Sequence, residues 1–235
     1  MFEPHPQLRL QAIPGHAPCV VVDGALRDPQ ALVALAVRQR ASFTEAVPNS
    51  FPGLELRMPA DFCALLNDFF LMHVRAHFGV RRLLSSFSRL SMVTRAPEQL
   101  TPLQRVPHRD YLTLDPGQRM FACVLYLFHD ATLGGTGFYR PRCSEAQINA
   151  LRDRWSTLSS AQFTRELGAE PAYPLASNAF FERVAEVPAA WNRLIFYDST
   201  VFHSGDIVHP QRMRSDAIAG RLTLNGFFVC RPVAS

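Results

Sequence analysis

The chain has 235 residues, of which 48% are hydrophobic and 19% are charged, and its formal net charge is +4. This length predicts a single domain, 1–235, with a core large enough to need no disulfides. The longest apolar runs, such as FACVLYLF, fall far short of the roughly 20 residues that a membrane span requires, which argues against a membrane protein.

The basic residues are all arginines, spread along the chain without a run of like charges. A nucleic-acid-binding domain would concentrate them, so we expect no nucleic-acid partner, whereas an anionic small-molecule substrate is compatible with this charge. The five cysteines are scattered and form no C-x-x-C pair, and the N-terminus lacks a basic segment followed by an apolar block. These features predict reduced thiols and a cytoplasmic location.

Residues 1–80 are predicted to form a mainly helical N-terminal support. The expected elements are, in chain order, a strand at 19–26, a helix at 28–40, a loop at 41–59 and a helix at 61–79. Asp28 caps the first helix, with Pro29 at its first position, and Gly79 ends the second helix.

Residues 81–235 are predicted to be rich in strands. Apolar runs predict them at 83–94, 119–128, 134–140, 179–187, 192–198 and 220–230. A helical insertion at about 141–178 interrupts them; it opens with a capping box, Ser144 to Gln147, and stays helical to about Leu167. The pattern predicts an α+β, mainly β domain: a jelly roll or barrel with helices packed outside it.

The segment QRVPHRDYLTLDP (104–116) carries two candidate metal ligands. In an extended chain residues i and i+2 project to the same side, so His108 and Asp110 are expected to point together and Arg109 to point away. Pro107 favours extended geometry just before the histidine.

A metal site open to substrate needs a third ligand. His203, just beyond an apolar strand, is preferred to His209, which precedes a proline in a polar loop. Two histidines and one carboxylate leave roughly half of an octahedron open, which suits non-haem Fe(II) enzymes that activate oxygen. Zinc accepts the same ligands, so this set leaves the metal open.

The segment GRLTLNGFF places Arg221 and Thr223 two residues apart on a predicted strand, and therefore on one face. A guanidinium fork beside a hydroxyl is a good receptor for a carboxylate. A dicarboxylic co-substrate could chelate a metal at one end and be held here at the other. The alternative for Arg221 is an ordinary surface or structural arginine.

Taken in order, five short segments resemble the iron(II)/2-oxoglutarate-dependent oxygenases, especially their prolyl-hydroxylase-like branch and its bacterial relatives. They are HRD (108–110), VLYLF (124–128), GGTGFY (134–139), HSG (203–205) and RLT (221–223), and the resemblance covers roughly residues 80–230. Relatives often have Asn after the YL pair, where this chain has Phe128 and His129. That departure leaves the ligand positions intact but argues against matching the chain to a specific relative.

The resemblance implies a double-stranded β-helix that binds Fe(II) through His108, Asp110 and His203. It further implies that Arg221 holds the distal carboxylate of 2-oxoglutarate with help from Thr223. Tyr126 matches a tyrosine that often hydrogen-bonds this carboxylate; its alternative is a core aromatic.

Other motifs are given structural interpretations. His73 and His77 share a helix face, but Val74 stands where zinc peptidases place a general-base Glu, which argues against a second metal site. GGTGF lacks the Lys-Ser/Thr of a phosphate loop and is interpreted as a tight turn between strands. The insertion at about 141–178, with Tyr173 and the nearby Arg140 and Arg142, is either a lid over the barrel mouth or a helical decoration.

The function that this resemblance implies is an Fe(II)-dependent dioxygenase, a hydroxylase that consumes 2-oxoglutarate and O2 and releases succinate and CO2. Its substrate would be a small molecule or a peptide. Two alternatives are a non-catalytic jelly-roll protein that binds a small molecule or a metal, and a metal-dependent isomerase or hydrolase on a similar barrel. Enzymes of the last class more often add His or Glu ligands and have no need of Arg221.

Overall fold

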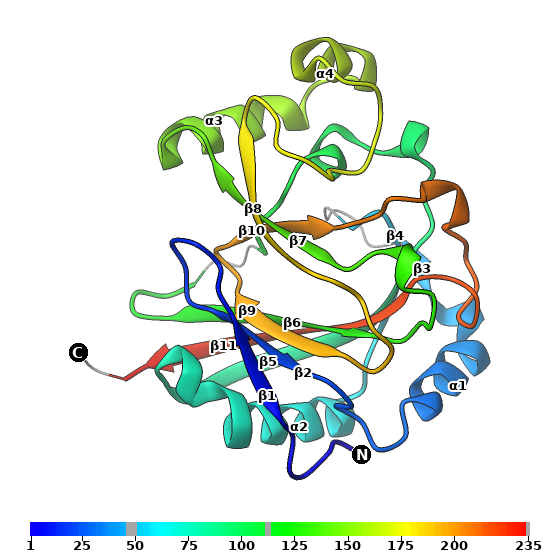
Figure 1. Ribbon diagram of the computed structural model, residues 1–235, viewed down its shortest axis with the longest axis vertical. Coiled ribbons are helices and arrows are strands. Elements are labelled where there is room, and N and C mark those ends of the chain that lie inside the picture. Colours follow the sequence, from blue (N-terminus) through cyan, green and yellow to red (C-terminus); the bar gives the residue numbers. More distant parts are fainter. Residues whose placement is uncertain (46–50, 111–113, 234–235) are drawn as a thin grey trace.

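The structure, a computed structural model, describes residues 1–45, 51–110 and 114–233. Its strands form two antiparallel sheets that face each other in the middle of the molecule (Figure 1). The large sheet has the spatial order β1 (Leu8–Gln11), β2 (Cys19–Val22), β9 (Leu194–Asp198), β6 (Arg119–Tyr126), β11 (Leu222–Pro232), β5 (Val80–Val93), β4 (Gly53–Arg57) and β3 (Thr44–Glu45). The small sheet has the order β10 (Phe202–Gly205), β7 (Thr136–Pro141) and β8 (Phe181–Val187).

The two N-terminal helices, α1 (Gln30–Arg38) and α2 (Ala60–Phe69), cover the outer face of the large sheet (Figure 1). Phe70, directly after α2, stacks on Phe228 of β11 with ring centroids 4.3 Å apart. A Cβ atom at Gly226 would lie 2.9 Å from Leu66 of α2, so the glycine permits this close approach. The prediction of helices packed outside a β-rich body is confirmed.

The inner face of the large sheet packs against the small sheet. Along β6 the buried side chains alternate: Phe121, Cys123 and Leu125 join the core under the helices, whereas Met120, Ala122 and Val124 join the core between the sheets. The prediction of a strand covered on both faces at 119–128 is confirmed. Because successive residues of β11 alternate in the same way, Thr223, Asn225 and Phe227 face the space between the sheets.

The helical insertion forms a third small core on the outside of the small sheet. Trp155 of α3 (Glu145–Ser156) and Phe163 of α4 (Ser160–Leu167) pack with Phe181 and Phe202. The expectation of one helix from 144 to about 167 is wrong, because the chain breaks after Ser156 and a second capping box, Ser159 to Gln162, starts α4. The predicted capping box at Ser144 is confirmed.

Other expected boundaries also need correction. The loop expected at 41–59 contains β3 and β4, and its residues 46–50 lie outside the described part of the chain. The helix expected over 61–79 is α-helical only to Phe69; a π-turn at Phe70–Val74 and a 3-10 turn at Arg75–Phe78 follow before the left-handed Gly79. Tertiary packing of Phe70 and Val74 in the core favours this change of winding over a regular helix. Strands β1 and β10 were not expected.

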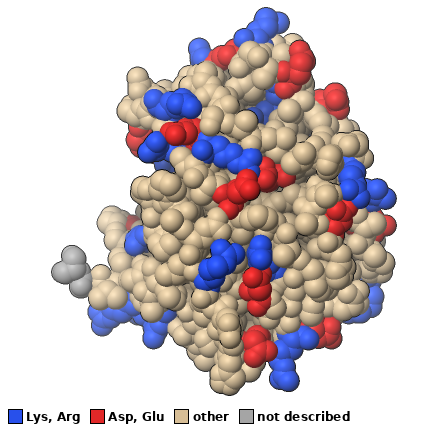
Figure 2. All heavy atoms as spheres, viewed as in Figure 1, with Lys and Arg blue, Asp and Glu red and all other residues tan. Residues whose placement is uncertain are grey.

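The surface carries no large field of one sign on the face in Figure 2, where arginines stand among acidic side chains. The five cysteines are free thiols. Within the described ranges, no helix combines the length and the apolar character needed to cross a membrane.

Candidate metal centre and its cavity

The two histidines predicted as ligands are joined through their backbones. His108 N donates to the His203 carbonyl oxygen over 2.9 Å, and His203 N donates to the His108 carbonyl oxygen over 2.8 Å. This short antiparallel bridge extends the edge of the small sheet at β10, and it leaves the two imidazole ring centroids 4.4 Å apart. Backbone hydrogen bonds alone therefore hold His108 and His203 side by side.

Asp110 completes the cluster. One ligand atom from each of His108, Asp110 and His203 lies within 4.8 Å of the other two, a spacing that a single metal ion can bridge. Among the described residues this is the one such cluster of histidine, cysteine and acidic side chains. The structure thus brings together the three residues that the sequence predicted as ligands.

The side chains of the cluster have the donor chemistry that a metal needs. The His203 Nδ1 atom lies 3.0 Å from the Val201 carbonyl oxygen, which can only accept, so Nδ1 carries the proton and Nε2 keeps its lone pair for a ligand. The Asp110 Oδ2 atom is buried and has no hydrogen-bond partner among the described residues; His203 Nε2, at 3.5 Å, is too far for a good hydrogen bond. A buried carboxylate oxygen without a partner is costly, and a divalent cation would satisfy it.

Burial also shifts the protonation of two ligands. Desolvation lowers the pKa of His108 well below its usual value, and the charges of His203 and Arg152 lower it further. Histidine must be neutral to bind a metal, so this shift favours the ligand form. Desolvation raises the pKa of Asp110, against the opposing effects of His203 and Arg89. The residues present therefore fit a divalent metal held by two imidazoles and one carboxylate.

Arg221 directly precedes β11, and its side chain is only 5% exposed. Its Nε atom donates to the Gly134 carbonyl oxygen over 3.1 Å and its Nη2 atom to the Gly135 carbonyl oxygen over 3.0 Å. Within the described ranges no carboxylate forms an ion pair with it, and burial lowers the pKa of its guanidinium. Its hydrogen bonds go to neutral carbonyl groups, and the nearby Asp206 carboxylate interacts with it electrostatically but forms its ion pair with Arg183. A desolvated cation of this kind favours an anion as ligand, and it lines the same cavity as the cluster.

The two glycines that open the GGTGF turn, Gly134 and Gly135, supply the carbonyl groups that accept hydrogen bonds from Arg221. A Cβ atom at Gly134 would lie 1.9 Å from the Asp206 carbonyl oxygen, and one at Gly135 would lie 2.0 Å from the Val187 carbonyl oxygen. Gly134 also has a φ of 93°, which side chains rarely adopt. The interpretation of GGTGF as a tight turn between strands is confirmed, and the turn also supplies the carbonyl groups that hold Arg221.

Thr223 and Tyr126 lie opposite each other on the neighbouring strands β11 and β6. Thr223 lines the cavity, whereas the Tyr126 side chain belongs to the core between the sheets. The Tyr126 hydroxyl group forms a 2.8 Å hydrogen bond with Thr136 Oγ1, and Thr136 does line the cavity. Any contact of Tyr126 with a bound molecule is therefore expected to act through Thr136, and a role for either residue stays a prediction.

The cavity that joins these groups has a volume of about 380 Å³. Four arginines line it, Arg89, Arg109, Arg152 and Arg221, against one acidic residue, Asp110. Aromatic residues also line it, including the stacked rings of Phe87 and Phe227, 4.7 Å apart, and the Arg89 guanidinium carbon lies 4.9 Å from the Phe227 centroid. Such a cavity favours a small anionic molecule with an apolar part.

The sequence missed several of these lining residues. Asn225 continues the face of Arg221 and Thr223 at the next alternate position, a signal that the period of a strand already contained. Arg152 reaches the cavity from α3, and nothing near it in the sequence indicates this contact.

Arg109 points to the insertion and not to the cluster. It forms an ion pair with Glu145, with Nη1 2.5 Å from Oε1, and a 2.9 Å hydrogen bond to Asn149 Oδ1. Both partners lie on α3, so the residue between the two ligands anchors the insertion beside the cavity.

The lid residues suggested by the sequence divide into two groups. Tyr173 lines the cavity and donates to the Arg95 carbonyl oxygen over 2.7 Å. Arg140 pairs with Glu182 and Arg142 donates to the Asn178 carbonyl oxygen, both away from the cavity lining. Closure of the insertion over the cavity stays a prediction.

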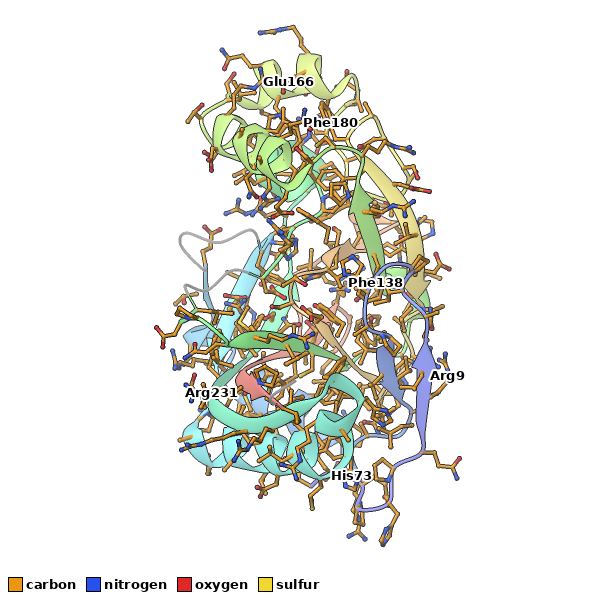
Figure 3. All side chains as sticks on the ribbon, turned by 90° about the vertical axis from the view of Figure 1, so that its left-hand side faces the viewer. Arg9, His73, Phe138, Glu166, Phe180 and Arg231 are labelled. Carbon is orange, nitrogen blue, oxygen red and sulfur yellow. The ribbon has the colours of Figure 1, made fainter. Side chains whose placement is uncertain are left out.

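The remaining histidines lie outside the cluster. His73 is on the helical layer at the opposite end of the molecule from the insertion, far from Phe138, which pairs with His203 in the small sheet (Figure 3). The π-turn and 3-10 turn that contain His73 and His77 remove the regular helical spacing on which a metal pair would depend. His129 stacks on Trp191, with ring centroids 4.0 Å apart.

The chain belongs to a family described as "Family of unknown function (DUF6445)", whose model matches residues 4–228. No curated protein matches the chain.

Among solved structures, the chain is similar to a prolyl-4-hydroxylase from Pseudomonas putida, with a TM-score of 0.50 and 14% identity over 94% of this chain and 95% of that one. Weaker similarities include HygX from Streptomyces hygroscopicus with nickel and 2-oxoglutarate bound (TM-score 0.45, 12% identity, 91% and 83% covered). They also include an N-substituted L-amino acid dioxygenase from Burkholderia ambifaria (TM-score 0.42, 12% identity, 97% and 95% covered). The resemblance to the prolyl-hydroxylase-like oxygenases is confirmed at the level of the fold.

Proposed function

We propose that this member of the DUF6445 family is an Fe(II)- and 2-oxoglutarate-dependent dioxygenase that hydroxylates its substrate and releases succinate and CO2. The observation that supports this function best is the cavity that the His108–Asp110–His203 cluster shares with Arg221, a buried arginine that forms no ion pair among the described residues. A metal ion held by the cluster would bind the α-keto carboxylate end of a dicarboxylate, and the Arg221 guanidinium would bind the carboxylate at its other end. The two sheets would then be the layers of a double-stranded β-helix within a single domain.

Each group of the cavity has a role in this proposal. His108, Asp110 and His203 would hold Fe(II), and the ion would supply the activation of O2 when it is bound. The fixed tautomer of His203 and the neutral form of His108 keep both imidazoles ready to bind a metal. The three residues of the cluster line the cavity, in which a small-molecule or peptide substrate would lie.

Arg221 would bind the distal carboxylate of 2-oxoglutarate through N–H groups that the two glycine carbonyls leave free. Thr223 of β11, which lies two residues after Arg221, would add a hydroxyl group as a hydrogen-bond donor. The Tyr126–Thr136 pair would position the wall beside them through its 2.8 Å hydrogen bond. The dicarboxylate would neutralise a buried guanidinium that forms no ion pair among the described residues.

The decisive experiment is an anaerobic titration of the purified protein with Fe(II) and 2-oxoglutarate, followed by absorbance. A visible charge-transfer band is expected when both are present, because the keto acid would chelate the metal. His108→Ala should lose the band, and His209→Ala, a variant of the rejected candidate ligand, should keep it. A wild-type protein that forms no band under these conditions would refute the proposal.

Turnover separates an enzyme from a binding protein. Admission of O2 to the complex should produce succinate slowly even without substrate, and His108→Ala should produce none above the background. Formation of the band without any succinate would favour the non-catalytic binding protein instead.

A further inference from the structure

Arg152 is a second cation of the cavity that forms no ion pair with the described residues. It lies on α3, is half-buried, and donates one hydrogen bond, from Nη1 to the Pro107 carbonyl oxygen over 3.0 Å. It forms no ion pair within the described ranges, and the residues outside them include no Asp or Glu side chain. Most of its five N–H donors are therefore available to a ligand.

The neighbouring arginine differs in this respect. Arg109 and Arg152 both lie over the ring of Phe202, with their guanidinium carbons 4.6 and 5.9 Å from its centroid. Arg109 is neutralised by Glu145 on α3, whereas Arg152 on the same helix is not. Arg89, on β5 and over the ring of Phe227, is likewise neutralised by Glu55 at 2.8 Å. Of the four cavity arginines, Arg152 and Arg221 form no ion pair with a described carboxylate, although Asp153 and Asp206 respectively interact with them electrostatically.

These two cations occupy different places in the cavity. Arg221 is seated on the carbonyl groups of the GGTGF turn, beside Thr223. Arg152 bonds to the residue that immediately precedes His108, so it stands next to the metal cluster. If 2-oxoglutarate takes Arg221, its two carboxylates are accounted for by that arginine and the metal. Arg152 then has no role in binding the co-substrate.

The apolar wall adds a second requirement. Phe87 and Phe227 stack with their centroids 4.7 Å apart and line the cavity, and Met120 extends the same apolar surface. A molecule that combines an anionic group with an apolar body would match both surfaces.

We propose that the primary substrate carries a carboxylate or phosphate group that binds Arg152, and an apolar part that lies against the Phe87–Phe227 wall. This inference rests on the proposed function, because it assigns Arg221 to 2-oxoglutarate. Arg152 acts here as a specificity residue contributed by the insertion, and Arg109 positions the helix that carries it.

The test uses three probes of similar shape: 3-phenylpropanoate, 3-phenylpropanamide and 2-phenylethyl phosphate. Their binding to the Ni(II)-loaded protein is measured by calorimetry in saturating 2-oxoglutarate, which keeps Arg221 occupied. At least one of the two anions should bind wild type tenfold or more tightly than the neutral amide. The anion that binds more tightly identifies the carboxylate or the phosphate as the source.

Variants of Arg152 separate a binding role from a structural one. Arg152→Gln should reduce the preference for the anion to less than twofold, and Arg152→Lys, which keeps the charge, should retain part of it. Arg165→Gln, a variant of an exposed arginine on α4, should behave as wild type. The affinity for 2-oxoglutarate should stay within threefold of wild type in all three variants.

Three results would overturn the inference: equal binding of anion and amide by wild type, absence of binding by both anions, or an anion preference that Arg152→Gln retains. Failure of the wild-type protein to bind 2-oxoglutarate at the start of the experiment refutes the proposed function itself. The two failures are thus distinguished within one set of titrations.

Discussion

Replacement of Arg221 by glutamine tests the co-substrate site most directly. The guanidinium is 5% exposed, donates to two glycine carbonyl groups and has no carboxylate partner among the described residues. Glutamine keeps much of the size of the side chain but removes the charge and the planar fork. The change should therefore affect a bound dicarboxylate far more than the protein itself.

The expected loss of affinity follows from the bonds removed. Charge-assisted hydrogen bonds contribute about 1.5–3 kcal/mol each, so a two-bond contact with a carboxylate is worth about 3–5 kcal/mol. Because each 1.4 kcal/mol is a factor of ten in a dissociation constant, 2-oxoglutarate should bind Arg221→Gln about 100- to 4,000-fold more weakly.

The ligand-free protein should respond differently. Two hydrogen bonds to carbonyl groups, worth about 1 kcal/mol each, are lost or weakened, but the desolvation cost of a buried cation without an ion pair is also removed, which offsets about the same amount. The free energy of unfolding without ligand should thus change by no more than about 1 kcal/mol in either direction. Saturating 2-oxoglutarate should stabilise wild type, by about 2.7 kcal/mol at 100 times its dissociation constant, and leave the variant unchanged.

Calorimetry on the Ni(II)-loaded protein gives the dissociation constants, and denaturant unfolding gives the stabilities. Arg214→Gln, a variant of an exposed arginine of the loop before β11, is the matched control and should bind as wild type. Binding of 2-oxoglutarate by Arg221→Gln within threefold of wild type would refute the reasoning.

Three further outcomes are expected. Asp110→Asn should lose stoichiometric Fe(II) binding while Arg109→Ala retains it, as measured by metal analysis after gel filtration; iron loss in both variants would contradict the assignment of ligands. Gly135→Ala places a Cβ atom 2.0 Å from a carbonyl oxygen, so it should lower the free energy of unfolding by about 1–3 kcal/mol in denaturant titrations and also weaken 2-oxoglutarate binding. Hydrogen bonds from two backbone N–H groups of its own loop lower the pKa of Asp216, so its stabilising effect is present above about pH 4 and lost as the pH falls. Asp216→Ala should therefore be less stable than wild type by about 1 kcal/mol at pH 7 and equally stable near pH 2; a difference that persists in acid would exclude this cause.

The sequence predicted the pair His108 and Asp110 because the direction of two side chains at i and i+2 depends only on the conformation of a short segment. The i, i+2 rule placed His108 and Asp110 on one side of an extended segment, and the same rule paired Arg221 with Thr223. His203 was predicted as the third ligand by its position after an apolar strand, although it lies within the short strand β10. All five residues line one cavity, and their roles as ligands stay predictions.

What the sequence did not predict depends on contacts between distant segments. The capping box at Ser144 identified a helix, but it contains no information on where the helix docks, so the contribution of Arg152 to the cavity was missed. The change of winding after Phe69 follows from packing of Phe70 against β11, which no local pattern encodes. Short strands such as β1 are too brief for a period-2 pattern to stand out.

The reciprocal hydrogen bonds between His108 and His203 have a consequence for the thermodynamics of metal capture. Two backbone segments that are 95 positions apart are already locked in register, so little conformational entropy remains to be lost when an ion arrives. Capture should then proceed with a small entropic penalty and without refolding of the segment. Amide hydrogen exchange at these two residues should be slow in the metal-free protein and change little after loading, whereas a site assembled by the metal would show protection only in the loaded state.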